Sequence, residues 1–213
     1  MLLLRFYTQT IQQLPEINFG TYQLAGDDCY RAVRTAIDAG YRGIDTASIY
    51  RNEEVVGKAI KDSGKRNDIF ITTKLSPMET GLEVAYQAFN ACLGRLGVAH
   101  VDMLLIHWPG KAKVATDSPE NRRARKQTWE ALERIHQEGR ARFIGVSNFT
   151  ETHLTQLFED GAKIKPYANQ VEVHVLLQQR SLREFCKSHG ILLQCYSPLG
   201  SGGAPVITPS KAK

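Results

Sequence analysis

Four side chains with complementary acid–base chemistry follow short apolar runs of the sequence: Asp45, Tyr50, Lys74 and His107. A free tyrosine has a pKa of about 10 and is a poor proton donor at neutral pH. An ammonium beside it stabilises the tyrosinate and lowers that pKa, and Lys74 can supply this charge. Asp45 can hold Lys74 in place, while His107 can hydrogen-bond a polarised oxygen. The set suits carbonyl reduction, in which a hydride reaches carbon and a proton reaches oxygen.

The elements that must bring these residues together alternate along the chain. Strand-like runs cover residues 17–22, 41–46, 68–74, 101–108, 141–147, 168–174 and 192–197. Helical patterns fill the stretches between them, at 27–39, 52–63, 79–95, 121–138, 150–160 and 179–189. Apolar blocks such as residues 101–106 are typical of strands buried on both faces, as in a parallel sheet covered by helices.

Local signals support these boundaries. A glycine follows each helical pattern, where a left-handed C-cap favours it: Gly40, Gly64, Gly97, Gly139, Gly161 and Gly190. Asp27, Asn52 and Thr150 stand at expected N-cap positions. Repeated βα units imply right-handed crossovers in an open doubly wound sheet or a barrel. No Gly-x-Gly-x-x-Gly follows the first strand, and Gly57-Lys58 lacks the neighbours of a phosphate-binding loop, so a barrel is favoured.

Composition excludes several classes of protein. The 213 residues are 42% hydrophobic and 23% charged, which indicates a globular chain rather than a disordered one. The four cysteines form no CxxC pair, so we expect reduced thiols, no metal site, and buried, inert Cys186 and Cys195. No apolar run reaches the roughly 18 residues of a membrane span. The net charge of +5 is a mild excess, and we expect a cytoplasmic protein with no nucleic-acid partner and no membrane partner.

Five motifs, in order, carry a resemblance to a known family. They read Gly-Ile-Asp-Thr-Ala-Ser-Ile-Tyr-Arg-Asn-Glu at 43–53, Ile-Thr-Thr-Lys-Leu at 71–75, Leu-Leu-Ile-His-Trp-Pro at 104–109, Ile-Gly-Val-Ser-Asn-Phe at 144–149 and Ala-Asn-Gln-Val-Glu at 168–172. Through them the chain resembles the aldo-keto reductases over about residues 14–201. The resemblance implies an α/β fold of the TIM (β/α)8-barrel type.

The resemblance also implies roles for particular residues. It makes Tyr50 the general acid, tuned by Lys74 and Asp45, and His107 the group that orients a small-molecule carbonyl substrate. It implies NADP(H) as cofactor, with the carboxamide held by Ser147, Asn148 and Gln170. Around the rest of the cofactor it places Tyr196, stacked on the ring, together with Gly20, Thr21, Tyr22, Asp45, Ser197, Leu199 and Ser201. Tyr22, Ile49, Trp108 and His107 would line the substrate pocket.

The ends of the sequence depart from the family pattern. The eighth βα unit and the C-terminal loop that would follow residue 201 are absent, residues 1–13 are atypical, and residues 202–213 read as a flexible tail. An incomplete barrel domain over 14–201 leaves an alternative to an active NADP-dependent reductase. The chain could be a shortened, catalytically weak or inactive family member that serves as a binding or regulatory module. The sequence leaves open the particular aldehyde or ketone, NADPH against NADH, and the oligomeric state.

Overall fold

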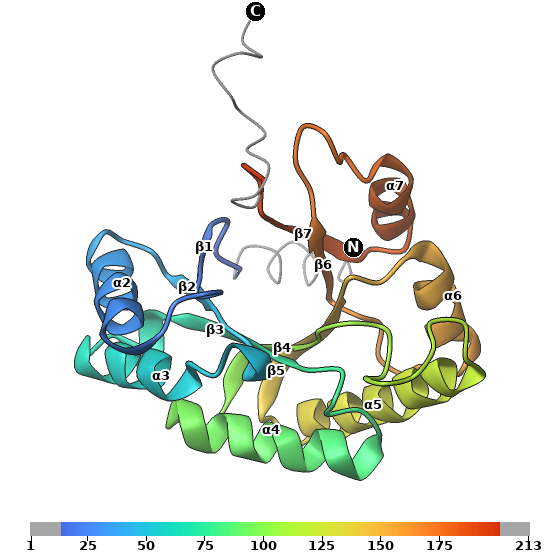
Figure 1. The fold of residues 1–213 in the computed structure, drawn as a ribbon, viewed down its shortest axis with the longest axis horizontal. Helices are drawn as coiled ribbons and strands as arrows, with labels where there is room; N and C mark the ends of the chain where they lie inside the picture. Colours follow the sequence, from blue (N-terminus) through green and yellow to red (C-terminus); the bar gives the residue numbers. More distant parts are fainter. Residues whose placement is uncertain (1–13, 201–213) are drawn as a thin grey trace, which may run out of the picture.

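The computed structural model describes residues 14–200, in which seven parallel strands form one curled sheet. The strands, paired in sequence order, are β1 (Asn18–Gly20), β2 (Gly43–Asp45), β3 (Phe70–Leu75), β4 (Val101–Ile106), β5 (Ala141–Ser147), β6 (Ala168–Glu172) and β7 (Leu192–Tyr196). The helices are α2 (Gly26–Asp38), α3 (Glu53–Asp62), α4 (Leu82–Leu96), α5 (Pro119–Gln137), α6 (Glu151–Glu159) and α7 (Arg180–Ser188), with short 3-10 turns η1 (Ser48–Tyr50) and η2 (Arg66–Asp68). Figure 1 shows the sheet as an arc with the helices on its outer side. The expected seven strands and barrel-type order are confirmed.

The chain turns are set by glycine, as the sequence indicates. Each of the six glycines after a helical pattern has a positive φ, between 63° and 101°. Side chains with a Cβ rarely adopt this left-handed conformation. Gly57 has a different role, because a Cβ there would lie 2.1 Å from the carbonyl oxygen of Leu96. The absence of a side chain lets α3 approach the end of α4 closely.

The larger hydrophobic core lies between the sheet and its helices. It is built from one stripe of each helix, such as Cys29, Val33 and Ile37 of α2, and from the outward-facing residues of the strands. Trp129 of α5 is 1% exposed within it, as expected for a packing residue. The burial of these apolar side chains is the main stabilising term for the outer layer.

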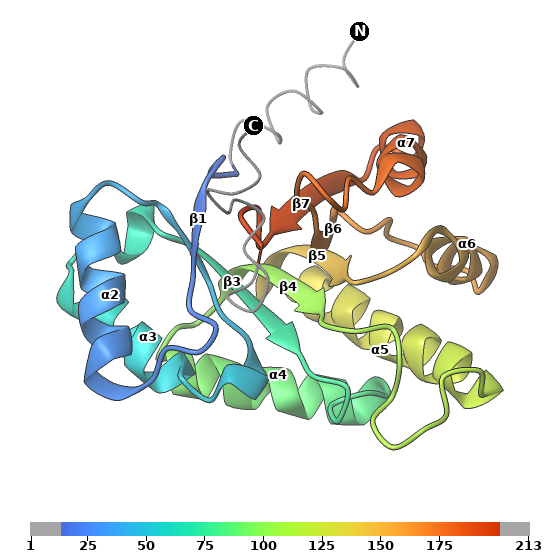
Figure 2. The ribbon, with the colours of Figure 1, turned by 45° about the horizontal axis from the view of Figure 1, so that its top comes forward.

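The inner face of the arc holds a much smaller core. Its buried members are Phe70, Met103, Leu105 and Ala168. Within residues 14–200, β1 and β7 are the two edges of the sheet and pair only with β2 and β6. Figure 2 shows these edges at opposite ends of the arc. A cavity of about 690 Å³ is lined by residues of both edges.

None of the helices in residues 14–200 is long and apolar enough to cross a membrane. The expectations for segments 1–13 and 202–213, and for Ser201, concern residues outside the described part of the chain.

Candidate active site

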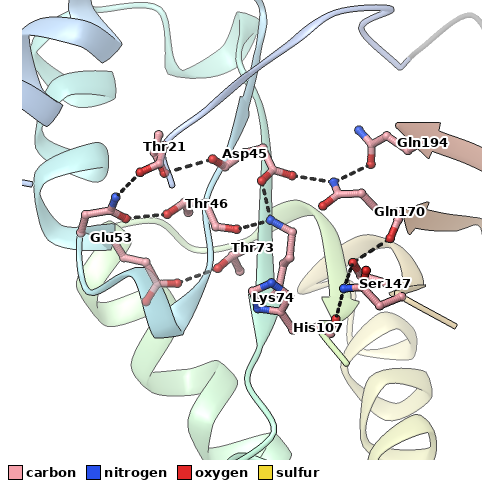
Figure 3. Close-up of polar contacts among 12 residues, drawn as sticks. Thr21, Asp45, Thr46, Glu53, Thr73, Lys74, His107, Ser147, Gln170 and Gln194 are labelled. Atoms are coloured by element: carbon pink, nitrogen blue, oxygen red, sulfur yellow. Dashed lines mark hydrogen bonds and ion pairs between the residues drawn. The ribbon is translucent and has the colours of Figure 1, made fainter. Parts of the chain in front are cut away.

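A buried ion pair joins the ends of β2 and β3. Lys74 Nζ donates to Asp45 Oδ1 and, over 2.9 Å, to the backbone oxygen of Thr46 (Figure 3). The Lys74 side chain is 1% exposed and that of Asp45 13%. The two charges stabilise each other, because either one alone at this burial would carry a large desolvation penalty. The parallel strands therefore place a fixed cation at the carboxyl end of β3.

Tyr50 lies beside this pair, at the end of η1. Lys74 Nζ lies 5.1 Å from the centroid of the Tyr50 ring. Burial, and next the negative charge of Asp45, raise the pKa of the Tyr50 hydroxyl above its usual range. The expected net lowering of this pKa is therefore wrong, because burial and the Asp45 charge outweigh any stabilisation of the tyrosinate by the nearby Lys74 ammonium. The Tyr50 hydroxyl is protonated at neutral pH.

His107 follows β4 and completes the expected group of four. Burial, and next the charge of Lys74, lower its pKa to about 3, so the imidazole is uncharged at neutral pH. Its ring centroid lies 5.7 Å from that of Tyr50. Its Nδ1 atom is buried without a hydrogen-bond partner in the described part of the chain. The structure thus brings a neutral acid, a neutral imidazole and a buried cation together.

Aromatic and apolar side chains surround Tyr50 and His107 at the surface. The Tyr22 ring centroid is 5.1 Å from that of Tyr50, and the Trp108 ring centroid is 6.4 Å from that of His107. Tyr22, Trp108 and Ile49 are 65%, 48% and 47% exposed. These side chains were expected to line a substrate pocket, and they form the exposed wall beside the four-residue group.

A second polar cluster joins the ends of β5, β6 and β7. Ser147 pairs in register with Gln170, and its hydroxyl donates to the Gln170 backbone oxygen over 2.8 Å. Asn148 Nδ2 donates to the backbone oxygen of His107 over 2.9 Å. The Tyr196 hydroxyl donates to Asn148 Oδ1 over 2.8 Å. The four expected carboxamide and ring contacts are therefore neighbours, and Asn148 links them to the strand end that carries His107.

Gln170 connects the two clusters. Its Nε2 atom donates to Asp45 Oδ2 over 2.8 Å and to Gln194 Oε1 over 2.9 Å (Figure 3). Sequence reasoning missed Gln194. The available signal was its position two residues before Tyr196 in the same strand, since alternate residues of a strand share a face. An amide on the inner face of an otherwise apolar strand could have marked it.

Of the remaining residues expected to contact the cofactor, two line the cavity between the sheet edges and two do not. Gly20 and Ser197 line the cavity between the sheet edges, together with Asp45, Gln170 and Tyr196. Thr21 is fully buried, and its hydroxyl and amide both bond the Asp45 backbone oxygen, so its side chain is committed to the fold. Leu199 is 68% exposed and does not line this cavity.

A buried support behind the site was also missed. Asn52 accepts from the Thr46 hydroxyl over 2.8 Å and donates to the backbone oxygens of Thr21 and Leu24. It precedes α3 as expected, but its side chain makes no cap and instead fastens the loop after β1 to the loop after β2. The next residue, Glu53, is 1% exposed and accepts from Arg95 Nε over 2.7 Å. These contacts fix the backbone on either side of Tyr50.

The chain matches a known family over most of its length. A profile described as the Aldo/keto reductase family matches residues 16–206. The sequence is 46% identical over 192 residues to the 9,11-endoperoxide prostaglandin H2 reductase of Trypanosoma cruzi, covering 89% of this chain and 64% of the relative. It is 42% identical over 214 residues to the glycerol 2-dehydrogenase (NADP(+)) of Saccharomyces cerevisiae, covering 92% and 68%. The chain thus spans about two thirds of the length of these relatives.

The fold of this chain is also similar to that of a solved aldo/keto reductase structure. A crystal structure of an aldo/keto reductase from Brucella melitensis superposes with a TM-score of 0.80 at 42% sequence identity. The match covers 87% of this chain and 69% of that structure.

Proposed function

Because the chain belongs to the aldo/keto reductase family, we propose that it carries the reaction centre of an NADP(H)-dependent oxidoreductase that reduces aldehydes or ketones to alcohols. One observation carries the proposal most strongly. The ion pair of Lys74 with Asp45 lies beside a protonated Tyr50 and an uncharged His107, all at the carboxyl ends of neighbouring strands. In barrel enzymes this end of the sheet is where reacting groups gather.

The polar cluster of β5, β6 and β7 fits a nicotinamide. Gln170 and Ser147 are 5% and 1% exposed, and Gln170 opens on a cavity of about 690 Å³. The cavity is large enough for a ligand of this size. Ser147, Asn148 and Gln170 would hold the carboxamide, and the Tyr196 ring would pack on the pyridine. The choice of NADP(H) is supported by the similarity to the glycerol 2-dehydrogenase (NADP(+)) of yeast.

The chain's own residues supply the proton and stabilise the negative charge that its transfer leaves on Tyr50. The hydride that reaches the carbonyl carbon is supplied by bound NADPH. The Tyr50 hydroxyl, protonated at neutral pH, gives its proton to the carbonyl oxygen. Lys74 stabilises the tyrosinate that remains, because its ammonium lies next to the ring and cannot move into water. Neutral His107 donates an N–H to the same oxygen and orients it.

The substrate is a small carbonyl compound with an apolar or aromatic body. Tyr22, Ile49 and Trp108 flank the reacting group with exposed apolar surface. Walls of this kind favour apolar ligands, while the polar groups fix the orientation of the carbonyl.

The test is the rate of NADPH oxidation with an aromatic aldehyde, measured for the wild-type chain and for Tyr50→Phe. We expect Tyr50→Phe to lose about 10²–10⁴-fold in kcat, the usual contribution of a general acid. Calorimetric titration with NADPH should give nearly the same Kd for both, because the hydroxyl is not a cofactor contact. Tyr41→Phe, a tyrosine at the other end of β2, is the matched control and should keep full activity.

Two results would overturn the proposal. One is a wild-type chain that folds but neither binds NADPH nor consumes it with any aldehyde. The other is a Tyr50→Phe variant with undiminished kcat, which would remove Tyr50 as the acid.

A further inference from the structure

We propose that the cavity between α5 and α6 is a binding site for a phosphate ester, separate from the reaction centre. The cavity has a volume of about 600 Å³, and residues of the loop before α5, of the first two turns of α5 and of α6 line it. Figure 1 shows α6 beside the end at which α5 begins. None of these lining residues also lines the cavity between the sheet edges. The inference goes beyond the proposed function and does not depend on it.

The first observation is a buried cation that has no anionic partner. Arg125 of α5 is 9% exposed and lines the cavity, yet it makes no ion pair within residues 14–200. Its bonds go to neutral oxygens: Nη1 donates to the Pro109 backbone oxygen over 3.0 Å, and Nη2 donates to Gln156 Oε1 over 2.6 Å. Burial, which outweighs the charge of Asp160, lowers the pKa of the Arg125 guanidinium. A buried charge in this position is costly, and a bound anion would offset the cost.

The second observation is that most of the Arg125 hydrogens remain available. One hydrogen on each Nη atom is used, so the Nε–H and the other hydrogen of each Nη have no partner in the described part of the chain. The planar fork of a guanidinium matches two oxygens of a phosphate at once, which makes arginine a common phosphate ligand. Arg125 is thus held in place by two bonds and keeps hydrogens for a ligand.

Two neutral neighbours in the cavity also offer hydrogens. His153 Nδ1 accepts from the Thr150 backbone N–H over 3.2 Å, which assigns the ring proton to Nε2. Burial, and next the charge of Arg125, lower the pKa of His153 to about 4, so the ring is uncharged at neutral pH. Gln156 Oε1 is taken by Arg125, which leaves the Nε2 hydrogens of Gln156. Both side chains line the cavity, and their free hydrogens select a ligand that accepts.

The charges around the cavity favour an anion. Four cationic side chains and two carboxylates line it. One carboxylate, Asp160, accepts from Arg122 through both of its oxygens, so its charge is already balanced. The other, Asp117, is exposed to water. Arg123 is exposed too and makes no ion pair within residues 14–200, so it adds a second unbalanced positive charge to that of Arg125.

These features together point to the phosphoryl group of a small ester. A phosphate ester carries nearly two negative charges at neutral pH and three strong acceptor oxygens, which suits two unbalanced cations and a set of N–H donors. A single carboxylate would balance only one of the charges. The cavity of about 600 Å³ is larger than a free phosphate needs and leaves room for a small organic body.

Calorimetric titration of the full chain at pH 7 and low ionic strength tests the site. The probes are inorganic phosphate and myo-inositol 1-phosphate, an ester without a carbonyl group. We expect both to bind, the ester more tightly because its body fills part of the cavity. Arg125→Met should weaken the ester about tenfold or more, since hydrogen bonds to a charged partner are lost. Arg31→Met is the matched control: it removes the same charge from an exposed pair with Asp28 on α2 and should leave the Kd unchanged.

Two further measurements do not depend on the folding of Arg125→Met. Arg123→Ala, at an exposed side chain, should weaken the ester about two- to fivefold, because water screens this charge. In the wild type, the ring-proton resonances of His153 should shift during the titration with the same midpoint as the heat. His136, whose Nδ1 lies 3.0 Å from the backbone oxygen of Ala141 near the other end of α5, serves as the unshifted reference.

Several results would overturn the inference. They are a wild-type chain that binds neither probe, equal weakening in Arg125→Met and Arg31→Met, and ester binding that leaves the His153 resonances unmoved. Equal Kd values for the two probes would overturn the assignment to an ester and leave inorganic phosphate as the ligand. Displacement of the ester by saturating NADPH would place the phosphoryl group in the cofactor site and also overturn the inference. Each result leaves the proposed reductase activity standing, because no step of that reaction uses this cavity.

Discussion

The centre of the sheet and its two edges differ in how completely their residues are covered. Every residue of β3 and β4 is buried, whereas no residue of β1 or β7 is. Both regions carry site residues: Lys74 and His107 belong to the centre, and Gln194 and Tyr196 belong to an edge. The central strands have helices on one face and neighbouring strands on both sides, while the edge strands face the cavity between them.

The difference separates two kinds of site residue. At and beside the centre, burial shifts the pKa values of the site residues, raising that of Tyr50 and lowering that of His107. At the edge, side chains reach the cavity and are held by hydrogen bonds rather than by packing. The proposed acid–base residues therefore lie in or beside the covered part of the sheet, whereas the proposed ligand contacts extend from the buried Ser147 and Gln170 to Tyr196 on the accessible edge.

The largest expected effect comes from removing the central cation. Lys74→Met leaves the mostly buried Asp45 carboxylate without its ionic partner, and we expect the free energy of unfolding to fall by about 3–5 kcal/mol. Urea denaturation measures the loss. Lys58→Met is the matched control, because Lys58 pairs with Asp62 at the surface, where screening by water leaves little to lose. Equal losses in the two variants would contradict the contrast drawn between centre and surface.

A smaller effect follows from the pKa of His107. Because this pKa is about 3 in the folded chain and about 6.5 in an unfolded one, only the unfolded chain takes up the proton between these values. Stability is therefore complete above pH 6.5 and falls as the pH drops toward 3. By pH 5 the loss is about 2 kcal/mol.

Urea midpoints at pH 7 and pH 5 measure this acid sensitivity. We expect His107→Gln to lose less stability on acidification than the wild type. His153, whose pKa burial lowers to about 4, contributes in the same direction and remains in the variant. An identical acid sensitivity in wild type and His107→Gln would show that His107 is not buried uncharged.

The smallest effect is a difference in thiol reactivity along the same sheet. Cys29, Cys92 and Cys186 are buried, whereas Cys195 of β7 is exposed, which corrects the expectation that it is buried. Partial burial raises the pKa of the Cys195 thiol and moderates its reactivity. A neutral thiol reagent should still modify Cys195 in the folded chain before the other three cysteines, which should react only after unfolding. Mass spectrometry of the labelled peptides identifies which one reacts. Rapid labelling of Cys92 in the folded chain would contradict its burial in the hydrophobic core between the sheet and its helices.

Much of this architecture could be read in the sequence. The order of strands and helices followed from the alternation of apolar blocks with helical stripes, because these periods reflect burial directly. The glycine positions followed from the left-handed turns that end helices. Asp27 shows the limit of such local reading: the N-cap of α2 is Ala25, and Asp27 lies in the first turn of that helix. An offset of two residues at a helix start is set by contacts that the local sequence does not contain.

The site was predicted only in part, because the sequence reveals local patterns but not contacts between distant residues. Asp45, Tyr50, Lys74 and His107 were identifiable because strand ends of a parallel sheet converge. The contacts of Asn52 with Thr21 and of Gln194 with Gln170 were not, since these partners lie 31 and 24 residues away in the sequence. The direction of the Tyr50 pKa shift was predicted wrongly because the sequence gives the types of charge nearby but not the extent of burial.

By itself the sequence determined the residue types, their order and the family they belong to, since these are properties of motifs and periodicity. Only the tertiary structure decided how charge and hydrogens are distributed among them. It placed Lys74 on Asp45, left His107 uncharged, and spent both hydrogens of Gln170 on Asp45 and Gln194. The physical reason is that desolvation and hydrogen-bond geometry depend on distances in space, which strand register and burial fix and sequence spacing does not.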